Sequence, residues 1–388
     1  MKRKNIIILM IDGGRLDYAQ NSKIFSELNA ELRKDWENLE KDSHNYCFQS
    51  YDWFETWTSI YRSNNNKFSL CIVVLKLKAE TIAILPFEIE KKYGLKILKW
   101  AENKQTDYCS PVLSKKFNLQ KEEFIEVYKT ILNKIKNFDI VYFVKQPKYV
   151  GELENPFVFF LNNFIDSKTH NILLPKTWED YNSTVLKKNF YIQNLRKEKL
   201  LKKLGNVSYK IVDDKNEKIK ILDKLFLQKN TRLGSQGIND AFTNTDQKFY
   251  KYFQDKILTN ASIHLSYIDL NGDPIAIHWG IIYKQRFYYL LLSMEEGKLK
   301  RYSPGRLLIS SLIKFSISKE LKIFDFTLGD ENYKVSWSNK ESALYNHAQL
   351  NSLNGLYFFL LIKIKLFLKQ VDKRNYIRKI IMFFKKIF

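Results

Sequence analysis

The segment from Lys300 to Trp337 constrains the fold more than any other part of the chain. It begins with a cationic turn, continues with apolar residues at helical spacing, and ends in a short β-rich apolar run. Ser303 is a favoured N-cap residue, and Pro304 suits the first helical position because no backbone N–H is needed there. We therefore predict a helix over residues 304–320, followed by a strand that ends before Gly329. This order favours the α/β (α+β) class.

The turn before this helix has the features of an anion site. The first helical turn leaves backbone N–H groups without partners and carries a partial positive charge. A glycine there lets an anionic group approach the backbone closely. An ordinary capped helix with solvated arginines is the alternative. The candidate anion-binding residues are Arg301, Tyr302, Ser303, Gly305 and Arg306.

The run SPGRLL, the helix after it and the run FDFTLGDENYK together resemble the C-terminal half of the BioF2-like (CelD-type) acetyltransferases. These are members of the GNAT superfamily and relatives of the FemAB peptidyltransferases. In GNAT enzymes a loop of the pattern Arg/Gln-x-x-Gly-x-Gly/Ala holds the pyrophosphate of acyl-CoA. Arg301, Gly305 and Arg306 occupy the corresponding stretch, with Pro304 in place of the first glycine of that pattern. The resemblance implies acetyl-CoA or another acyl-CoA as co-substrate.

The resemblance extends more weakly over residues 36–350 and implies two tandem GNAT-like halves, each with a mixed, mostly antiparallel sheet flanked by helices. Alternating strand signals over 69–77 and 81–90 predict one hairpin, and those over 262–270 and 274–282 flank an Asn-Gly turn that predicts another. The expected units are a leader strand and helix at 1–42, an N-terminal half at 43–170, a C-terminal half at 171–350 and a basic helical tail at 351–388.

Residues 1–28 are similar to the first strand of sulfatase and alkaline-phosphatase-like hydrolases, in which the terminal aspartate, here Asp12, binds a metal. One carboxylate does not make a metal site, and no recognisable cluster of Asp and His follows. We therefore expect a leader without a catalytic role.

The cysteines Cys47, Cys71 and Cys109 show no C-x-x-C pairing, and the five histidines are dispersed. This usage predicts neither a disulfide framework nor a structural metal, and it favours the cytoplasm.

The formal net charge of +22 favours an anionic partner, such as nucleic acid, an acidic glycan, anionic lipid or a phosphate-rich cofactor. Two segments concentrate this charge. Residues 186–204 form a predicted basic helix, which is either a surface for an anionic acceptor or a solvated face. Residues 355–388 mix apolar and cationic side chains, which favours a helix lying on an anionic membrane or one packed on the domain.

Acyl transfer needs an anion cradle, a donor for the thioester carbonyl oxygen and a base for the acceptor. The candidate bases are His278, Asp325, Asp330 and Glu331. Tyr333 suits protonation of the leaving thiolate, and Lys334 suits an acidic acceptor. Each has a plainer alternative: a packed strand histidine, a turn carboxylate, or exposed turn residues.

The sequence thus favours an acyltransferase acting on an amine or hydroxyl of a surface polysaccharide or sugar precursor. The alternatives are a FemAB-like aminoacyl-tRNA-dependent peptidyltransferase, with the basic helix holding RNA, and a non-catalytic membrane-associated scaffold.

Overall fold

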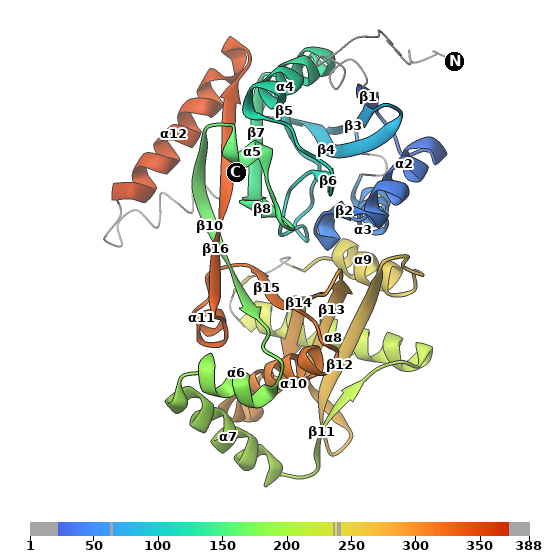
Figure 1. The fold of residues 1–388 in the computed structure, drawn as a ribbon. Coiled ribbons are helices and arrows are strands. Elements are labelled where there is room, and N and C mark those ends of the chain that lie inside the picture. The colour runs from blue at the N-terminus through green and yellow to red at the C-terminus, as the bar shows by residue number, and fades with distance from the viewer. Residues whose placement is uncertain (1–21, 63–64, 236, 239–241, 372–388) are drawn as a thin grey trace.

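The computed structural model describes residues 22–62, 65–235, 237–238 and 242–371. In this part of the chain, two α/β halves lie end to end and are joined by two long strands, β10 and β16 (Figure 1). A single mixed, mostly antiparallel sheet of 14 strands runs through both halves. The predicted fold class is confirmed. The strand predicted before Asp12 lies outside the described residues.

The N-terminal half is formed by the elements from β1 to α5. Its strands are β1 (Ser22–Phe25), β2 (Ser43–His44), β3 (Phe68–Leu77), β4 (Glu80–Lys92), β5 (Leu95–Trp100), β6 (Val112–Ser114), β7 (Ile140–Pro147), β8 (Tyr149–Val150) and β9 (Leu153–Glu154). Its helices are α2 (Ala30–Lys41), η1 (Cys47–Gln49), α3 (Tyr51–Tyr61), α4 (Lys121–Ile135) and α5 (Pro156–Phe159).

The C-terminal half also consists of sheet strands and helices. Its strands are β10 (Asn163–Leu173), β11 (Val207–Ile211), β12 (Ala261–Leu270), β13 (Asp273–Tyr283), β14 (Arg286–Met294), β15 (Ile323–Leu328) and β16 (Lys340–Leu350). Its helices are α6 (Trp178–Thr184), α7 (Lys188–Lys202), α8 (Lys215–Ser235), α9 (Asn244–Gln254), η2 (Gly297–Tyr302), α10 (Pro304–Ser318) and α11 (Asn332–Trp337). The last elements, η3 (Leu353–Gly355) and α12 (Leu356–Val371), lie against the N-terminal half, where α12 packs on Leu95, Ile97 and Ile140 (Figure 1).

The strand order is β1-β3-β4-β5-β7-β16-β10-β15-β14-β13-β12-β11, with β6 paired to β4 and β2. Both predicted hairpins are confirmed as β3–β4 and β12–β13. In the second, Asn271 and Gly272 have φ values of 55° and 95°, as a tight hairpin turn with two left-handed residues requires. β16 lies between β7 and β10, so the last strand ties the two halves together.

Each half contains a parallel strand pair that is joined over only a few residues. β14 pairs with β15 from Arg286 to Tyr288, although β14 continues to Met294. β5 pairs with β7 at Ile97 and Leu98. Beyond these positions the strands diverge, and each pair therefore forms a wedge.

The helix predicted at residues 304–320 is confirmed as α10, which packs on the sheet through its buried residues Leu308, Ile309, Leu312 and Ile313. The prediction that the Ser303 side chain caps this helix is wrong. Ser303 follows the η2 turn and has a φ of 56°, whereas a capping side chain needs an extended backbone at that position.

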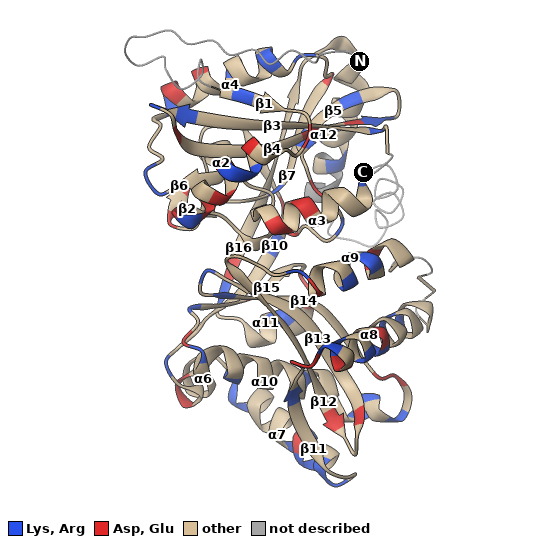
Figure 2. Cartoon of the chain, turned by 90° about the vertical axis from the view of Figure 1, so that its right-hand side faces the viewer, with Lys and Arg blue, Asp and Glu red and all other residues tan. Residues whose placement is uncertain are grey.

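Among the described helices, none is both long enough and apolar enough to cross a bilayer. Lys and Arg occur on the elements of both halves (Figure 2). The net charge alone therefore does not single out one site.

Candidate active site

A cleft of about 670 Å³ opens where β14 and β15 diverge. Its walls come from these two strands, from the start of α10, from α8, from α11 and from one N-terminal-half residue, Asp107. This volume falls within the range of about 300–1,000 Å³ that is typical of small-molecule sites. The wedge of the C-terminal half is therefore a genuine cavity.

The start of α10 borders this cleft through Ser303, Gly305 and Arg306. It has no side-chain cap and no acidic residue in its first turn. The Ser303 and Arg306 N–H groups donate to the carbonyls of Lys300 and Ser303, whereas the Gly305 N–H has no partner among the described residues and suits an anion. Gly305 fits closely, because a Cβ at this position would lie 3.1 Å from Cε of Met294.

The corresponding wedge of the N-terminal half differs in two ways. Helix α4 has a reciprocal capping box and carries Glu122 and Glu123 in its first turn, which disfavours an anion. The loop after β5 also crosses the wedge, where the Cys109 N–H donates to the Lys145 carbonyl at 3.0 Å. The anion site predicted from the sequence therefore has no equivalent there.

Arg301 and Tyr302 lie apart from the cleft. The Arg301 guanidinium stacks on the Tyr302 ring at 4.8 Å and donates to its hydroxyl at 2.6 Å. Tyr302 instead lines a small cavity against α7. Of the five predicted anion-binding residues, the structure thus brings together Ser303, Gly305 and Arg306.

Tyr333 and Lys334 both line the cleft. Burial, together with the Glu331 carboxylate, raises the pKa of Tyr333 above its usual value, so the phenol keeps its proton. The Lys334 ammonium donates to the Leu328 carbonyl at 2.6 Å and pairs with Glu331 at 2.9 Å. Tyr289, which is 4% exposed on β14, also lines the cleft, and its hydroxyl has no hydrogen-bond partner among the described residues.

Asp325 is fully buried and is not among the residues that line the cleft. Its carboxylate accepts from Arg286 Nη1 at 2.7 Å, from the Tyr108 hydroxyl at 2.8 Å and from the Thr327 N–H at 2.8 Å. Thr327 has a φ of 58°, a strained value for a β-branched residue. Asp325 therefore holds a strained strand residue at the cleft wall.

His278 also lies outside the cleft lining and is fully buried. Its ring stacks on Tyr289 at 4.6 Å and on Phe287 at 5.5 Å. Burial, with a smaller effect of His264, lowers the pKa of His278 well below its usual value. The imidazole therefore stays neutral among the aromatic rings that surround it.

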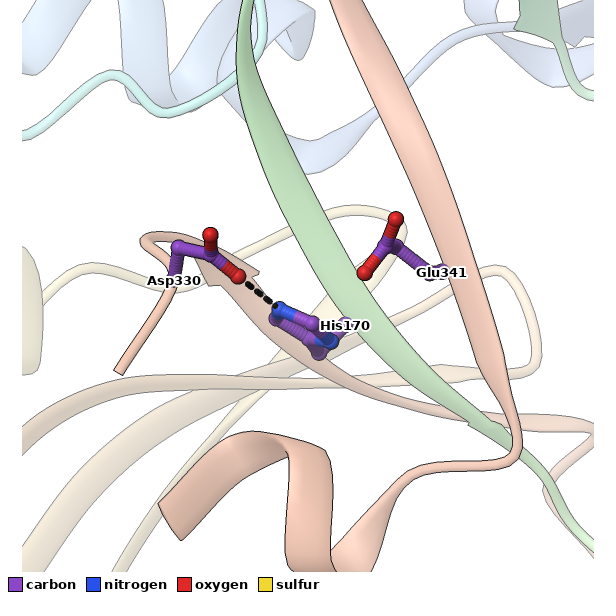
Figure 3. Close-up of side chains that lie close together, drawn as sticks. All are labelled: His170, Asp330 and Glu341. Carbon is purple, nitrogen blue, oxygen red and sulfur yellow. Dashed lines mark hydrogen bonds and ion pairs between the residues drawn. The ribbon is translucent and has the colours of Figure 1, made fainter. Parts of the chain in front are cut away.

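Asp330 points to β10 and away from the cleft lining. Figure 3 shows it beside His170 and Glu341, with His170 Nε2 and Asp330 Oδ1 at 2.9 Å. These three side chains could hold a metal ion by their spacing. Each carboxylate already has a partner: Asp330 contacts His170, and Glu341 pairs with Lys168 at 2.7 Å. The His170–Asp330 and Lys168–Glu341 pairs thus tie β10 to the end of β15 and to β16.

Two cleft residues were missed by sequence reasoning. Asp107 reaches the cleft from a loop of the other half, and burial raises its pKa above the usual value, while Thr327 and Lys145 oppose this shift. Lys229 faces the cleft from α8, and burial with the neighbouring Arg232 lowers its pKa to about 8. No local pattern marks either residue, since both are placed by long-range packing.

Comparison with known proteins agrees with this geometry. Residues 191–335 match the family model described as "Acetyltransferase (GNAT) domain", a range that includes β14, β15 and α10. No curated protein matches the sequence.

Solved structures share the fold across most of the chain at low identity. FemX has a TM-score of 0.54 and 10% identity, covering 84% of this chain and 98% of that chain. A conserved protein from Bacteroides thetaiotaomicron has a TM-score of 0.51 and 10% identity, covering 84% and 99%. L-PGS from Bacillus licheniformis has a TM-score of 0.50 and 9% identity, covering 86% and 95%. The resemblance to GNAT enzymes is thus confirmed at the level of the domain and the fold: residues 191–335 match a GNAT acetyltransferase domain, in a chain of two α/β halves that shares the fold of FemX.

Proposed function

We propose that the protein transfers an acyl group from acyl-CoA to an amine or hydroxyl, in the cleft between β14 and β15. The observation that carries this proposal is the uncapped start of α10, which borders that cleft through Ser303, Gly305 and Arg306. A diphosphate at the Gly305 N–H and the Arg306 side chain would direct a pantetheine arm into the wedge.

The reaction joins the acceptor nitrogen or oxygen to the thioester carbon, breaks the carbon–sulfur bond and protonates the sulfur. Asp107 is the proposed base, because its carboxylate borders the cleft and is held by burial at a raised pKa. The Tyr333 hydroxyl is the proposed proton donor to sulfur. A bulge in β14 leaves Leu290 out of register with β13 at the cleft wall, and its backbone N–H is the proposed donor to the carbonyl oxygen.

Two neighbouring arginines allow a direct test of the cofactor site. We expect Arg306→Ala to weaken acetyl-CoA binding about 10- to 100-fold, because it removes a charged partner of the diphosphate worth about 1.5–3 kcal/mol. Arg301→Ala should change affinity less than twofold, since that side chain is engaged with Tyr302 and does not line the cleft. Arg306 also contacts Asn194 and Phe190, but it does line the cleft. Isothermal titration calorimetry on the full chain measures both.

Equal losses in the two variants, or no heat with any short acyl-CoA, would overturn this assignment. In the second case a FemAB-like peptidyl transfer from aminoacyl-tRNA becomes the better proposal. What favours it is the exposed basic surface of α7, with Arg196, Lys199 and Lys202. Filter retention of charged tRNA, lost on replacing Lys199, would support that alternative. Lys197 is a poor probe because its ammonium donates to the Arg301 carbonyl.

We further propose that the protein works in the cytoplasm at the inner face of the membrane, with helix α12 in contact with anionic lipid. One side of α12 packs on the sheet through Phe358 and Ile362. Another side exposes a stripe of large apolar residues: Leu356, Tyr357, Leu360 and Ile364. Such a helix suits the interfacial region of a bilayer.

We expect the double substitution Leu360→Glu and Ile364→Glu to reduce binding to phosphatidylglycerol-containing vesicles at least tenfold. Each apolar side chain contributes about 1.5–3 kcal/mol on full burial, and the new charges oppose anionic lipid. Leu227→Glu on α8, where the leucine is 64% exposed, is the matched control. Flotation measures binding, and undiminished flotation of the double variant would show that α12 is not the contact. Substitution is preferable to deletion, because removing α12 would uncover Leu95 and Ile97.

A further inference from the structure

A second cavity, of about 300 Å³, lies where the two halves meet and shares no lining residue with the cleft. It is lined by the N-terminal-half residues Tyr46 and Tyr108 and by strands β10 and β16 of the joining region. Tyr108 is adjacent in sequence to Asp107, the proposed base. The two cavities therefore lie on either side of one short loop.

The wall of this cavity contains a buried polar atom that nothing satisfies. Asn171 on β10 is 7% exposed, and its Oδ1 has no hydrogen-bond partner among the described residues. A buried acceptor without a partner costs about 1–3 kcal/mol, so such groups call for a ligand or water. A ligand hydroxyl or amine would supply the missing donor.

The same wall carries a guanidinium that is fixed in place and balanced in charge by Asp325, so the net positive charge at the cavity comes from lysines. The Arg286 guanidinium is bound by Asp325 through one nitrogen and lies over the Tyr46 ring at 5.1 Å. Arginine has five N–H donors, so this one hydrogen-bonded carboxylate among the described residues leaves other donors for a second anion. Lys148 and Lys340 add positive charge at the rim, while Glu341 is neutralised by Lys168.

Aromatic rings complete the cavity. Tyr46 and Tyr108 stand with ring centroids 4.6 Å apart, and Tyr149 and Tyr345 lie along the lining. Tyr46 and Tyr108 are buried and pack on each other, so Tyr149 and Tyr345 are the rings whose faces could pack against the C–H faces of a sugar. Aromatic faces, a hydroxyl-seeking acceptor and fixed cations together select a small hydroxylated anion.

We propose that this cavity binds the phosphorylated sugar portion of the acceptor, with its phosphate at Arg286 and Lys340 and a hydroxyl or amine at Asn171. The role as an acceptor site rests on the proposed acyl transfer, whereas binding itself does not. The cavity would then hold this portion of the acceptor on one side of the 107–108 loop, and the rest of the acceptor would extend past the loop to the acyl donor on the other side.

Calorimetry on the full chain with glucosamine 6-phosphate tests the assignment, with glucosamine, inorganic phosphate and glucuronate as comparison ligands. We expect glucosamine 6-phosphate to bind at least tenfold more tightly than the other three. Asn171→Leu should weaken it at least tenfold, because it removes the acceptor atom from a cavity of unchanged size. Lys340→Ala, at an exposed position that folding does not need, should weaken it about threefold or more. Lys129→Ala, an exposed lysine on α4, should leave binding unchanged.

The same samples titrated with acetyl-CoA separate this proposal from the previous one. Asn171→Leu and Lys340→Ala should retain full affinity for acetyl-CoA. No binding of glucosamine 6-phosphate by a chain that binds acetyl-CoA would overturn the cavity assignment alone. Tighter binding of glucuronate would also overturn it, by selecting a carboxylate rather than a phosphate.

Discussion

Asp107→Asn is expected to lower the rate of acyl transfer by about 10²–10⁴-fold, the range over which a positioned base contributes. The amide keeps the size of the carboxylate but cannot accept the acceptor's proton. Thiol release from acetyl-CoA, with a panel of amines and sugars as acceptors, measures the rate. Asp213→Asn, at an exposed position after β11, is the control and should leave the rate unchanged.

The pH dependence gives this prediction a second readout. Because burial raises the pKa of Asp107, the wild-type rate should rise with pH through a value above that of an ordinary aspartate. This acidic limb should disappear in Asp107→Asn. A limb that persists unchanged in the variant would exclude Asp107 as the base.

Stability should move in the opposite direction from activity. A carboxyl group whose folded-state pKa is raised binds its proton more tightly in the folded protein. Its contribution to stability is therefore present at low pH and is lost as pH rises through the folded-state pKa. At neutral pH the Asn variant avoids burying a charge, so its free energy of unfolding should be equal to or above that of the wild type. A loss of activity with a parallel loss of stability would instead indicate a packing role.

Local sequence signals were sufficient for elements whose partners are close in the chain. Pro304 and the apolar spacing after it predicted α10, and the Asn271-Gly272 turn predicted the β12–β13 hairpin. The insertion of β16 between β7 and β10 joins residues about two hundred positions apart, and no periodicity carries that information. Ser303 shows the limit even at short range, because the preceding η2 turn changed its backbone conformation.

The residues of the candidate site also divide into those that local sequence predicts and those that long-range packing places. The turn at the start of α10 could be read from residue types, since glycine, proline and arginine have direct local roles. The alternation in β15 also predicted that Asp325 points opposite to Phe324 and Phe326, and its contacts agree with this. Arg286, from β14, and Tyr108, from the N-terminal half, occupy the face to which Asp325 points. The chemistry of Asp325 therefore depended on packing that the sequence does not display.

Asp325→Ala is accordingly expected to lower the free energy of unfolding by about 3–5 kcal/mol, the usual cost of removing one partner from a buried ion pair. Arg286 would remain buried without its anion, and the Tyr108 hydroxyl and Thr327 N–H would lose their acceptor. Urea unfolding followed by tryptophan fluorescence measures the change.

The double substitution Arg286→Met and Asp325→Leu separates a buried-charge effect from a simple loss of volume. It removes both charges while keeping apolar bulk, so it should recover part of the stability lost in Asp325→Ala. If Asp325 were instead the catalytic base, Asp325→Asn would abolish turnover with little effect on unfolding. That outcome would contradict the structural role of Asp325. An amide cannot neutralise Arg286, and it would leave the strained Thr327 backbone without the carboxylate that holds it.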